Sequence, residues 1–114
     1  SYHDARGALP AGRDANEYSA FAYILPYMEQ DNVFRLIDFT VPVNINAPGV
    51  NAAPMAHKVK SFQCPSDANI GNVPAQWAPA SYRVNQGSNL LWGLPTSSGS
   101  NAGFPAPNGP FFLN

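Results

Sequence analysis

Charged residues are scarce in this chain of 114 residues. Asp, Glu, Lys and Arg make up 11% of it, whereas an ordinary soluble domain has about 25%. Six basic and seven acidic residues leave a formal net charge of −1, so no strong field attracts phosphate backbones or anionic lipid. The composition excludes nucleic acid as an expected partner and predicts an uncharged polar surface.

Cysteine, long apolar runs and catalytic motifs are also lacking. Cys64 is the only cysteine, so the chain cannot form an internal disulfide. No apolar run approaches the roughly 18 to 20 residues that a membrane helix needs. The sequence contains no Gly-rich phosphate loop, no Gly-x-Ser-x-Gly elbow and no His-Glu-x-x-His. We therefore expect a non-enzymatic protein without a cofactor.

Aromatic residues, proline and glycine are plentiful instead. Two Trp, five Tyr and seven Phe accompany 45% hydrophobic residues, which is enough for one core in a chain of this size. Twelve Pro and nine Gly are spread along the chain and predict many turns between short elements. We expect a single domain over residues 1–114, with a flexible loop at residues 94–110.

Helices are predicted in the first half of the chain. Ser19 is a candidate N-cap, followed by apolar residues spaced for one helical face: Phe21, Ile24, Leu25 and Met28. Pro26 interrupts this pattern and predicts a kink or a restart, because proline lacks the backbone N–H group. A second amphipathic run follows Asp31 and is expected to pack near the first: Val33, Phe34, Leu36 and Ile37. A single helical turn is expected at 52–57.

Strands are predicted in the second half. Residues 58–64 read as a strand with Phe62 and Cys64 as its buried pair, and Pro65 ends it in a turn with Ser66. Residues 81–85 and 109–113 are two further candidates. No crossover helix separates these strands, so the pattern predicts an α+β fold with short helices packed on a small antiparallel sheet, rich in loops.

Cys64 and its neighbours have two readings. Cys64 could be a nucleophile with His3 or His57 as its base, but a reactive thiol needs an accessible, electropositive setting. A cysteine beside Phe62 at the end of a strand is more typical of a small buried hydrophobe. We therefore assign no catalytic residue and expect structural roles for Pro26, Phe62, Cys64 and Pro65.

Two kinds of ligand site remain open. His3 and Asp4, joined by Asp67 or His57, could hold a metal ion, although the carboxylates of Asp4 and Asp67 could instead accept backbone hydrogen bonds in turns. Trp77, Tyr82 and Trp92 stand among Pro, Ser and Gly residues, where exposed rings could stack on a carbohydrate or another solute. The alternative is that these rings cover a small core under long loops.

A set of short motifs occurs in order along nearly the whole chain: Tyr2-His3-Asp4, Leu9-Pro10-Ala11-Gly12, Leu25-Pro26-Tyr27-Met28-Glu29-Gln30, Phe62-Gln63-Cys64-Pro65-Ser66-Asp67, Ser81-Tyr82 and Gly109-Pro110-Phe111-Phe112. Together they resemble the domain of unknown function 1559 family of bacterial proteins. Members of that family carry a prepilin-type cleavage and methylation signal and an apolar helix before the first motif, and a His followed by nine residues and Asp-Gly near the end.

The resemblance implies a type IV pilin-like or type II secretion pseudopilin-like head whose N-terminal apolar helix is absent here. It implies a periplasmic or extracellular place in the cell envelope, with membrane contact only through that missing helix. Like subunits or other pseudopilins are the implied partners, and secreted cargo or glycan are further candidates. The resemblance also implies that Cys64 has a disulfide partner in the upstream helix. A head without its packing helix is expected to expose an apolar groove.

Overall fold

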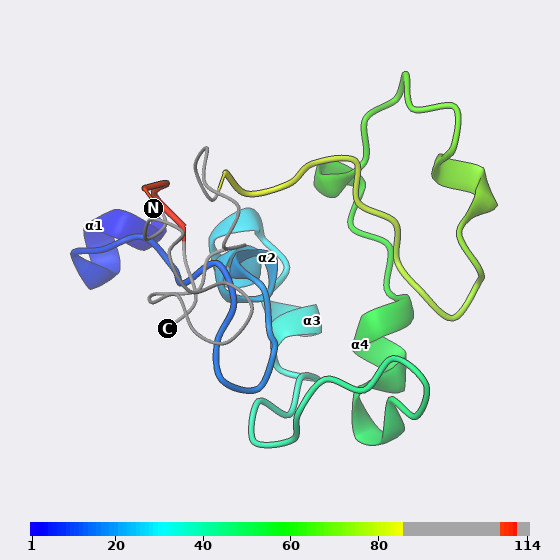
Figure 1. Cartoon of the computed structure of the whole chain (residues 1–114), viewed down its shortest axis with the longest axis horizontal. Helices are drawn as coiled ribbons and strands as arrows, with labels where there is room; N and C mark the ends of the chain where they lie inside the picture. The colour runs from blue at the N-terminus through cyan, green and yellow to red at the C-terminus, as the bar shows by residue number, and fades with distance from the viewer. Residues whose placement is uncertain (86–107, 112–114) are drawn as a thin grey trace, which may run out of the picture.

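The computed structural model describes residues 1–85 and 108–111, and within them the chain forms short helices joined by long connections (Figure 1). The α-helices are α1 (Tyr2–Arg6), α2 (Ala20–Ile24), α3 (Asp31–Phe34) and α4 (Ala52–Ala56). The 3₁₀-helices are η1 (Leu25–Met28), η2 (Gly49–Asn51), η3 (Lys60–Phe62) and η4 (Ile70–Asn72). None of the helices in these ranges has the length and apolarity needed to cross a membrane.

The prediction of an α+β fold on an antiparallel sheet is wrong. Across the described ranges the β pairing consists of one isolated antiparallel bridge, between Arg13 and Ser19. The predicted strand at 58–64 contains η3 instead, and residues 81–85 and 108–111 form no strand. Residues 112 and 113 of the last candidate, Trp92 and most of the predicted 94–110 loop lie outside the described residues.

The helix pattern from Ser19 to Met28 is confirmed, including the break at Pro26. Helix α2 ends at Ile24 and the chain continues as η1, with Pro26 in its first turn, where the missing N–H group costs no intrahelical bond. Ser19 occupies the N-cap position, but its hydroxyl makes no capping hydrogen bond. Helix η1 ends at Glu29, which has φ +58° and donates its N–H group to the carbonyl of Leu25.

The second predicted run is also helical and packs beside the first. Helix α3 contacts η1 and buries Val33 almost completely. Asp31 lies in its first turn and forms a 2.6 Å ion pair with Arg35 on the surface. Leu36 was expected on the packed face, yet 58% of it is exposed, because the α-helix already ends at Phe34.

A small apolar core joins the helices to the second half of the chain. Leu25 from η1, Val33 from α3 and Val59 from the segment before η3 form its buried centre. Three partly buried side chains pack against this centre: Phe34, Ile37 and Phe62. Val59 and Phe62 are three residues apart, which is the spacing that places side chains on one face of a 3₁₀ turn.

A hairpin turn precedes α2 and positions its first residues. The N–H group of Asp14 donates to the carbonyl of Tyr18, and that of Glu17 donates to the carbonyl of Asp14. The carboxylate of Asp14 accepts from the N–H groups of Asn16 and Tyr18 and from the hydroxyl of Tyr23. Glu17 has φ +71°, so it occupies the left-handed position where three-residue hairpin loops favour glycine.

A buried polar cluster fixes the connection between α3 and α4. Asn51 is 4% exposed, and its side chain accepts from the N–H group of Asp38 at 2.8 Å and donates to the carbonyl of Asp38 at 3.1 Å. It also donates to the hydroxyl of Tyr18 at 2.8 Å. That hydroxyl shares its hydrogen between the carbonyls of Asp38 and Val41. The cluster therefore satisfies groups from three separate segments.

Residues 57–85 leave α4, reverse at η4 and return, and we refer to them as the arm (Figure 1). One hydrogen bond connects the returning segment to α4, from the N–H group of Ala78 to the carbonyl of Met55 at 2.8 Å. A second hydrogen bond connects the outgoing and returning parts of the arm, from the N–H group of Ser81 to the carbonyl of Phe62 at 2.8 Å. Pro79 lacks an N–H group, so it cannot extend these contacts into a ladder.

Candidate functional site

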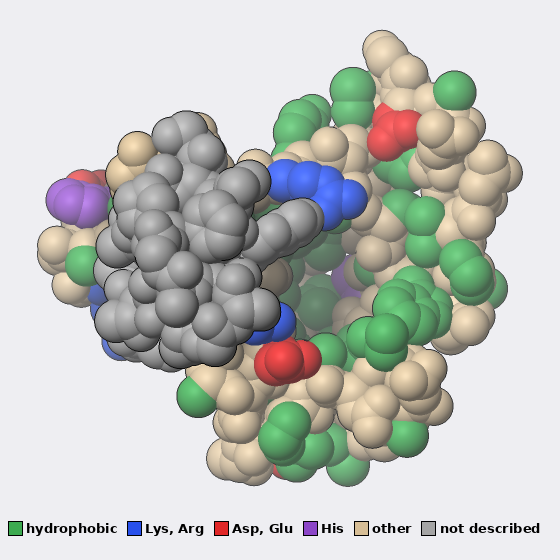
Figure 2. All heavy atoms as spheres, in the orientation of Figure 1, with side chains coloured by type: hydrophobic (Ala, Val, Ile, Leu, Met, Phe, Trp, Pro, Cys, Tyr) green, Lys and Arg blue, Asp and Glu red, His purple; other side chains and the backbone are tan. Residues whose placement is uncertain are grey.

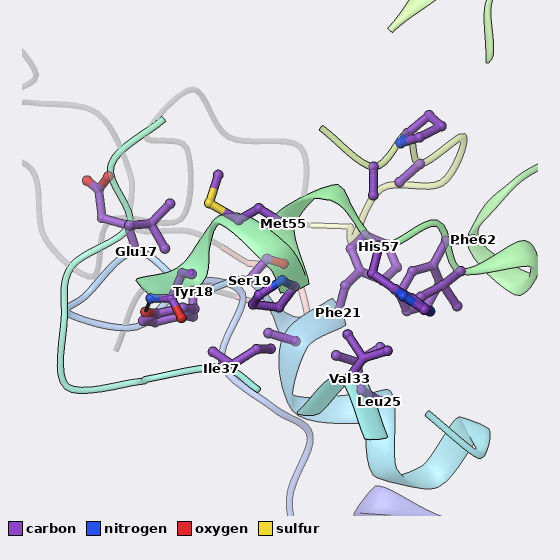
Figure 3. Close-up of a pocket in the computed structure, with 18 residues that line it drawn as sticks. Glu17, Tyr18, Ser19, Phe21, Leu25, Val33, Ile37, Met55, His57 and Phe62 are labelled. Atoms are coloured by element: carbon purple, nitrogen blue, oxygen red, sulfur yellow. Dashed lines mark hydrogen bonds between the residues drawn. The ribbon is translucent and has the colours of Figure 1, made fainter. Parts of the chain in front are cut away.

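An apolar cavity of about 310 Å³ lies between the helices and the arm. Figure 2 shows the hollow in the middle of the molecule, with hydrophobic side chains beside it. Phe21, Leu25, Val33 and Ile37 line it from the side of α2, η1 and α3, as Figure 3 shows. The opposite wall consists of α4 and arm residues: Pro54, Met55, Val59, Phe62, Ala78, Pro79 and Ala80. The cavity is thus an extension of the core.

The polar residues that line the cavity are mostly committed to other contacts. Tyr18 and Asn51 bond each other and the 38–41 backbone. Glu17 lies at the edge and its carboxylate is 3.4 Å from the guanidinium of Arg13. Ser19 and His57 are exposed residues that also line the cavity. The arrangement can accept an apolar group, and it offers few polar contacts to orient one.

Two phenols, that of Tyr18 at the cavity wall and that of Tyr23, which does not line the cavity, remain protonated at neutral pH. Burial is the main cause that raises the pKa of Tyr18 above its ordinary value, and the charges of Asp38 and Asp14 add to it. Burial likewise raises the pKa of Tyr23, and the carboxylate of Asp14, which accepts its hydrogen bond, raises it further. These groups therefore act as hydrogen-bond donors and packing surfaces.

The turn around Cys64 is confirmed, and Ser81 is attached to it. The N–H group of Asp67 donates to the carbonyl of Cys64 at 3.0 Å, closing the turn over Pro65. The hydroxyl of Ser81 accepts from the N–H group of Cys64 at 3.0 Å and donates to the carboxylate of Asp67 at 2.8 Å. Two motifs seventeen residues apart thereby meet in one contact, which we call the Ser81 latch. Cys64 itself is a free, half-buried thiol.

The predicted metal ligands are not brought together. His3 and Asp4 belong to α1, which lies at the opposite side of the molecule from the arm that carries Asp67 (Figure 1). Asp4 accepts from the hydroxyl and backbone N–H group of its helix cap, and Ser1 lowers its pKa chiefly through this hydroxyl. Within residues 1–85 and 108–111, no three His, Cys, Asp or Glu side chains gather in a metal-binding arrangement.

The two described residues proposed for stacking, Trp77 and Tyr82, do not share a cavity. Tyr82 is 50% exposed and lines a second cavity, of about 480 Å³, together with Tyr2, Phe21 and Phe111. Trp77 is half-buried and lines neither of the two cavities described. Trp92 lies outside the described residues. The structure therefore places one of the three rings at a cavity.

Most residues of the apolar cavity were missed by sequence reasoning. Pro54 and Met55 lie in the helical turn predicted at 52–57, but one turn does not show which face packs, and Ala78 to Ala80 belong to a segment without helical or strand periodicity. The i, i+3 pair of Val59 and Phe62 is the one usable signal, since it favours a 3₁₀ turn over a strand. The contact between the two halves is long-range and leaves no trace in a single sequence.

Comparison with known proteins identifies a family. The model of a family described as a protein of unknown function, DUF1559, matches residues 1–111. The chain belongs to this family. This confirms the resemblance found in the ordered motifs, and the family description assigns no activity. No curated protein and no solved structure matches the chain, so what a DUF1559 chain does has to be argued from its own residues.

Proposed function

We propose that this DUF1559 chain is a non-enzymatic structural or interaction module of a pseudopilin-like protein in the bacterial cell envelope. It faces the periplasm or the exterior and packs against neighbouring subunits. The observation that carries the proposal is the apolar cavity, because its walls include large apolar side chains that are only half-buried, those of Phe21, Met55 and Phe62. Apolar surface of this kind gains stability when a partner removes it from water.

The chemistry around the cavity favours packing over catalysis. Tyr18 and Asn51 at its wall are committed to hydrogen bonds within the protein, and the raised pKa of the Tyr18 phenol suits neither a base nor a nucleophile at neutral pH. The chain also has few charges with which to perturb a substrate. The role implied by the family resemblance is kept without the sheet, because residues 1–85 and 108–111 form none.

A partner that suits this cavity presents apolar side chains and no charge. Among the described residues that line the cavity, the one carboxylate is that of Glu17, which is already paired with Arg13. A charged cargo or a phosphate backbone would lose its hydration there without gaining a counter-charge. Neighbouring subunits of a secretion or pilus assembly are therefore the proposed partners, with secreted cargo of apolar character as the second candidate.

Site-specific photo-crosslinking in the producing bacterium tests this proposal. Replacing Met55, which lines the cavity, with a benzophenone amino acid should give a recurrent adduct with one envelope protein. The same probe at the exposed Ala15, in the hairpin turn, is the matched control and should give none. Equal adducts at both positions, or none at Met55 while circular dichroism shows a folded chain, would contradict the proposal.

A carbohydrate- or solute-binding module is a second proposal, supported by Tyr82 alone among the stacking candidates. Its half-exposed ring lines the 480 Å³ cavity with Tyr2 and Arg83, and rings at a cavity wall can stack on sugar faces. Calorimetric titration with sugars should show saturable binding that Tyr82→Ala removes and that Val73→Ala, at an exposed residue lining neither cavity, retains. No response to any sugar would discard this candidate.

A further inference from the structure

The connection between α3 and α4 exposes apolar side chains on an ordered backbone. Val41, Ile45 and Val50 are 40%, 52% and 67% exposed. Figure 2 shows hydrophobic side chains gathered along the lower edge, where Figure 1 places this connection. We call residues 41–50 the apolar loop. Exposed aliphatic side chains gathered in one segment indicate an interaction surface more strongly than scattered ones do.

Hydrogen bonds hold the apolar loop in place before any partner arrives. The carbonyl of Val41 accepts from the hydroxyl of Tyr18 at 2.6 Å, and the N–H group of Val43 donates to the carbonyl of Asn16 at 2.9 Å. Farther along, the side chain of Asn44 accepts from the backbone of Asn46 at 3.0 Å. A loop that is already ordered loses little conformational entropy when it is buried in an interface.

The loop and the cavity match each other in charge. No Asp, Glu, Lys or Arg occurs from Phe39 to Ala56, and the described lining of the cavity includes one residue of these types, Glu17 at its edge. Two uncharged apolar surfaces can meet without leaving a buried charge unpaired. The net charge of −1 also gives two copies little mutual repulsion.

The loop and the cavity are parts of one surface, because Val43 of the apolar loop lines the cavity of its own chain. When the same surface of two copies meets itself, the contact is reciprocal and closes with two-fold symmetry. We propose that a second copy of this chain covers the cavity, an inference that rests on the proposed interaction role. The apolar loop of each copy packs against the cavity of the other. The product is a closed dimer.

The arrangement accounts for more of the exposed apolar surface than other occupants do. A small apolar molecule in the cavity would cover half-buried wall residues such as Met55 and Phe62 but leave Ile45 and Val50 in water. A charged peptide would find no counter-charge on either surface. A second copy buries the cavity walls and the loop in the same step.

Sedimentation velocity on residues 1–114 tests this proposal, from about 1 µM to about 1 mM chain. The expected result is a concentration-dependent monomer–dimer equilibrium. A buried carboxylate without a partner should weaken the dimer at least about tenfold, so Ile45→Asp and Val50→Asp should each raise the Kd by that factor. Val73→Asp is the matched control, because Val73 is an exposed valine of the arm, and it should leave the Kd unchanged.

A dye that fluoresces in apolar sites provides the second readout. It should bind the monomeric Val50→Asp variant more than the wild-type dimer, whose cavity is covered. A chain that stays monomeric throughout this range, or Val73→Asp disrupting the dimer as strongly as Val50→Asp, would overturn the dimer. If the chain is monomeric in sedimentation but the Met55 probe still crosslinks to another envelope protein, the dimer is contradicted and the proposed function is not. If the chain is monomeric and the Met55 probe also gives no crosslink, the proposed function is contradicted as well.

Discussion

The helices and the arm are held by different kinds of contact. In residues 14–56, which we call the helical body, Tyr18, Ala20, Leu25, Val33, Asn51 and Pro54 are buried. In the arm, residues 57–85, Val59 and Pro79 are the buried residues, and hydrogen bonds at Ser81 and Ala78 maintain its shape. Burial and satisfied polar groups stabilise the body, whereas the arm depends on a few partly exposed bonds.

The difference teaches how the cavity arises. The body has apolar side chains that its own helices do not cover, and the arm supplies the missing wall with small residues such as Ala78 and Ala80. Because these side chains are short, they do not fill the space between the arm and the helical body, and this space is the cavity. The cavity is the boundary between a stable region and a weakly attached one.

Removing an aliphatic side chain from the body should have the largest effect. Leu25→Ala should lower the free energy of unfolding by about 2–5 kcal/mol, because Leu25 is 5% exposed and central to the core. Val73→Ala in the arm should cost less than about 0.5 kcal/mol, since Val73 is 37% exposed. Urea unfolding of both variants measures the contrast, and similar losses would contradict the division into body and arm.

The Asn51 cluster should be the next most sensitive point. Asn51→Ala leaves the N–H group of Asp38 without its partner and should lower the free energy of unfolding by about 2–3 kcal/mol. Asn46→Ala, at an exposed asparagine of the apolar loop, is the control and should change it by less than about 0.5 kcal/mol. Thermal unfolding followed by circular dichroism compares them; a mild Asn51 variant would show that the cluster is dispensable.

Loss of the Ser81 latch should change the pKa of Asp67 more clearly than it changes the free energy of unfolding. The hydroxyl of Ser81 is the main cause that holds the pKa of Asp67 below its ordinary value of 3.8, and the N–H group of Asn69 adds to it. Because the folded pKa is lower than the unfolded one, the contact stabilises the fold above pH 3.8 and is lost as pH falls through the folded pKa.

Ser81→Ala should therefore move the pKa of Asp67 up toward 3.8, as measured by NMR titration of its carboxyl carbon. The pKa of Asp38, which is lowered by the hydroxyl and N–H group of Thr40, is an internal control and should stay where it is. An unchanged Asp67 would mean that the latch is open in solution.

The smallest effect is a gain at the hairpin turn of the body. Glu17 has φ +71°, a conformation that costs a residue with a side chain about 1 kcal/mol or more. Glu17→Gly should raise the free energy of unfolding by about 0.5–1 kcal/mol, after the loss of the exposed pair with Arg13. Ala15→Gly, in the same turn without a positive φ, should lower it. Chemical denaturation resolves the sign, and a loss at Glu17 would refute this account of the turn.

Sequence reasoning worked where a local signal and the fold agreed. Pro26 broke the helix where the missing N–H group predicted, and Pro65 placed the turn before Asp67. The single helical turn expected at 52–57 is α4. These features depend on backbone chemistry within a few residues, so the sequence alone is enough to predict them.

The sequence-based predictions were wrong where contacts between residues far apart in the chain decide the structure. The alternation around Phe62 indicated a strand, but a sheet needs a neighbour with free N–H groups, and the returning segment carries Pro79. Asn51 carries no local signal, because its partner Tyr18 is 33 residues away. The hairpin turn at residues 14–18 was not predicted, because Glu17 occupies the left-handed position at which a glycine would have indicated the turn.

Residue-level hydrogen exchange of residues 1–114 tests the central claim most directly: a stable helical body and a weakly attached arm enclose the cavity. At low chain concentration, the amides of Val33 and Arg35 in and after α3 should exchange only through global unfolding. Those of Cys64, Asp67 and Ser81 should exchange far sooner by local opening of the arm. Equal protection in both regions, or an arm slower than α3, would contradict the account.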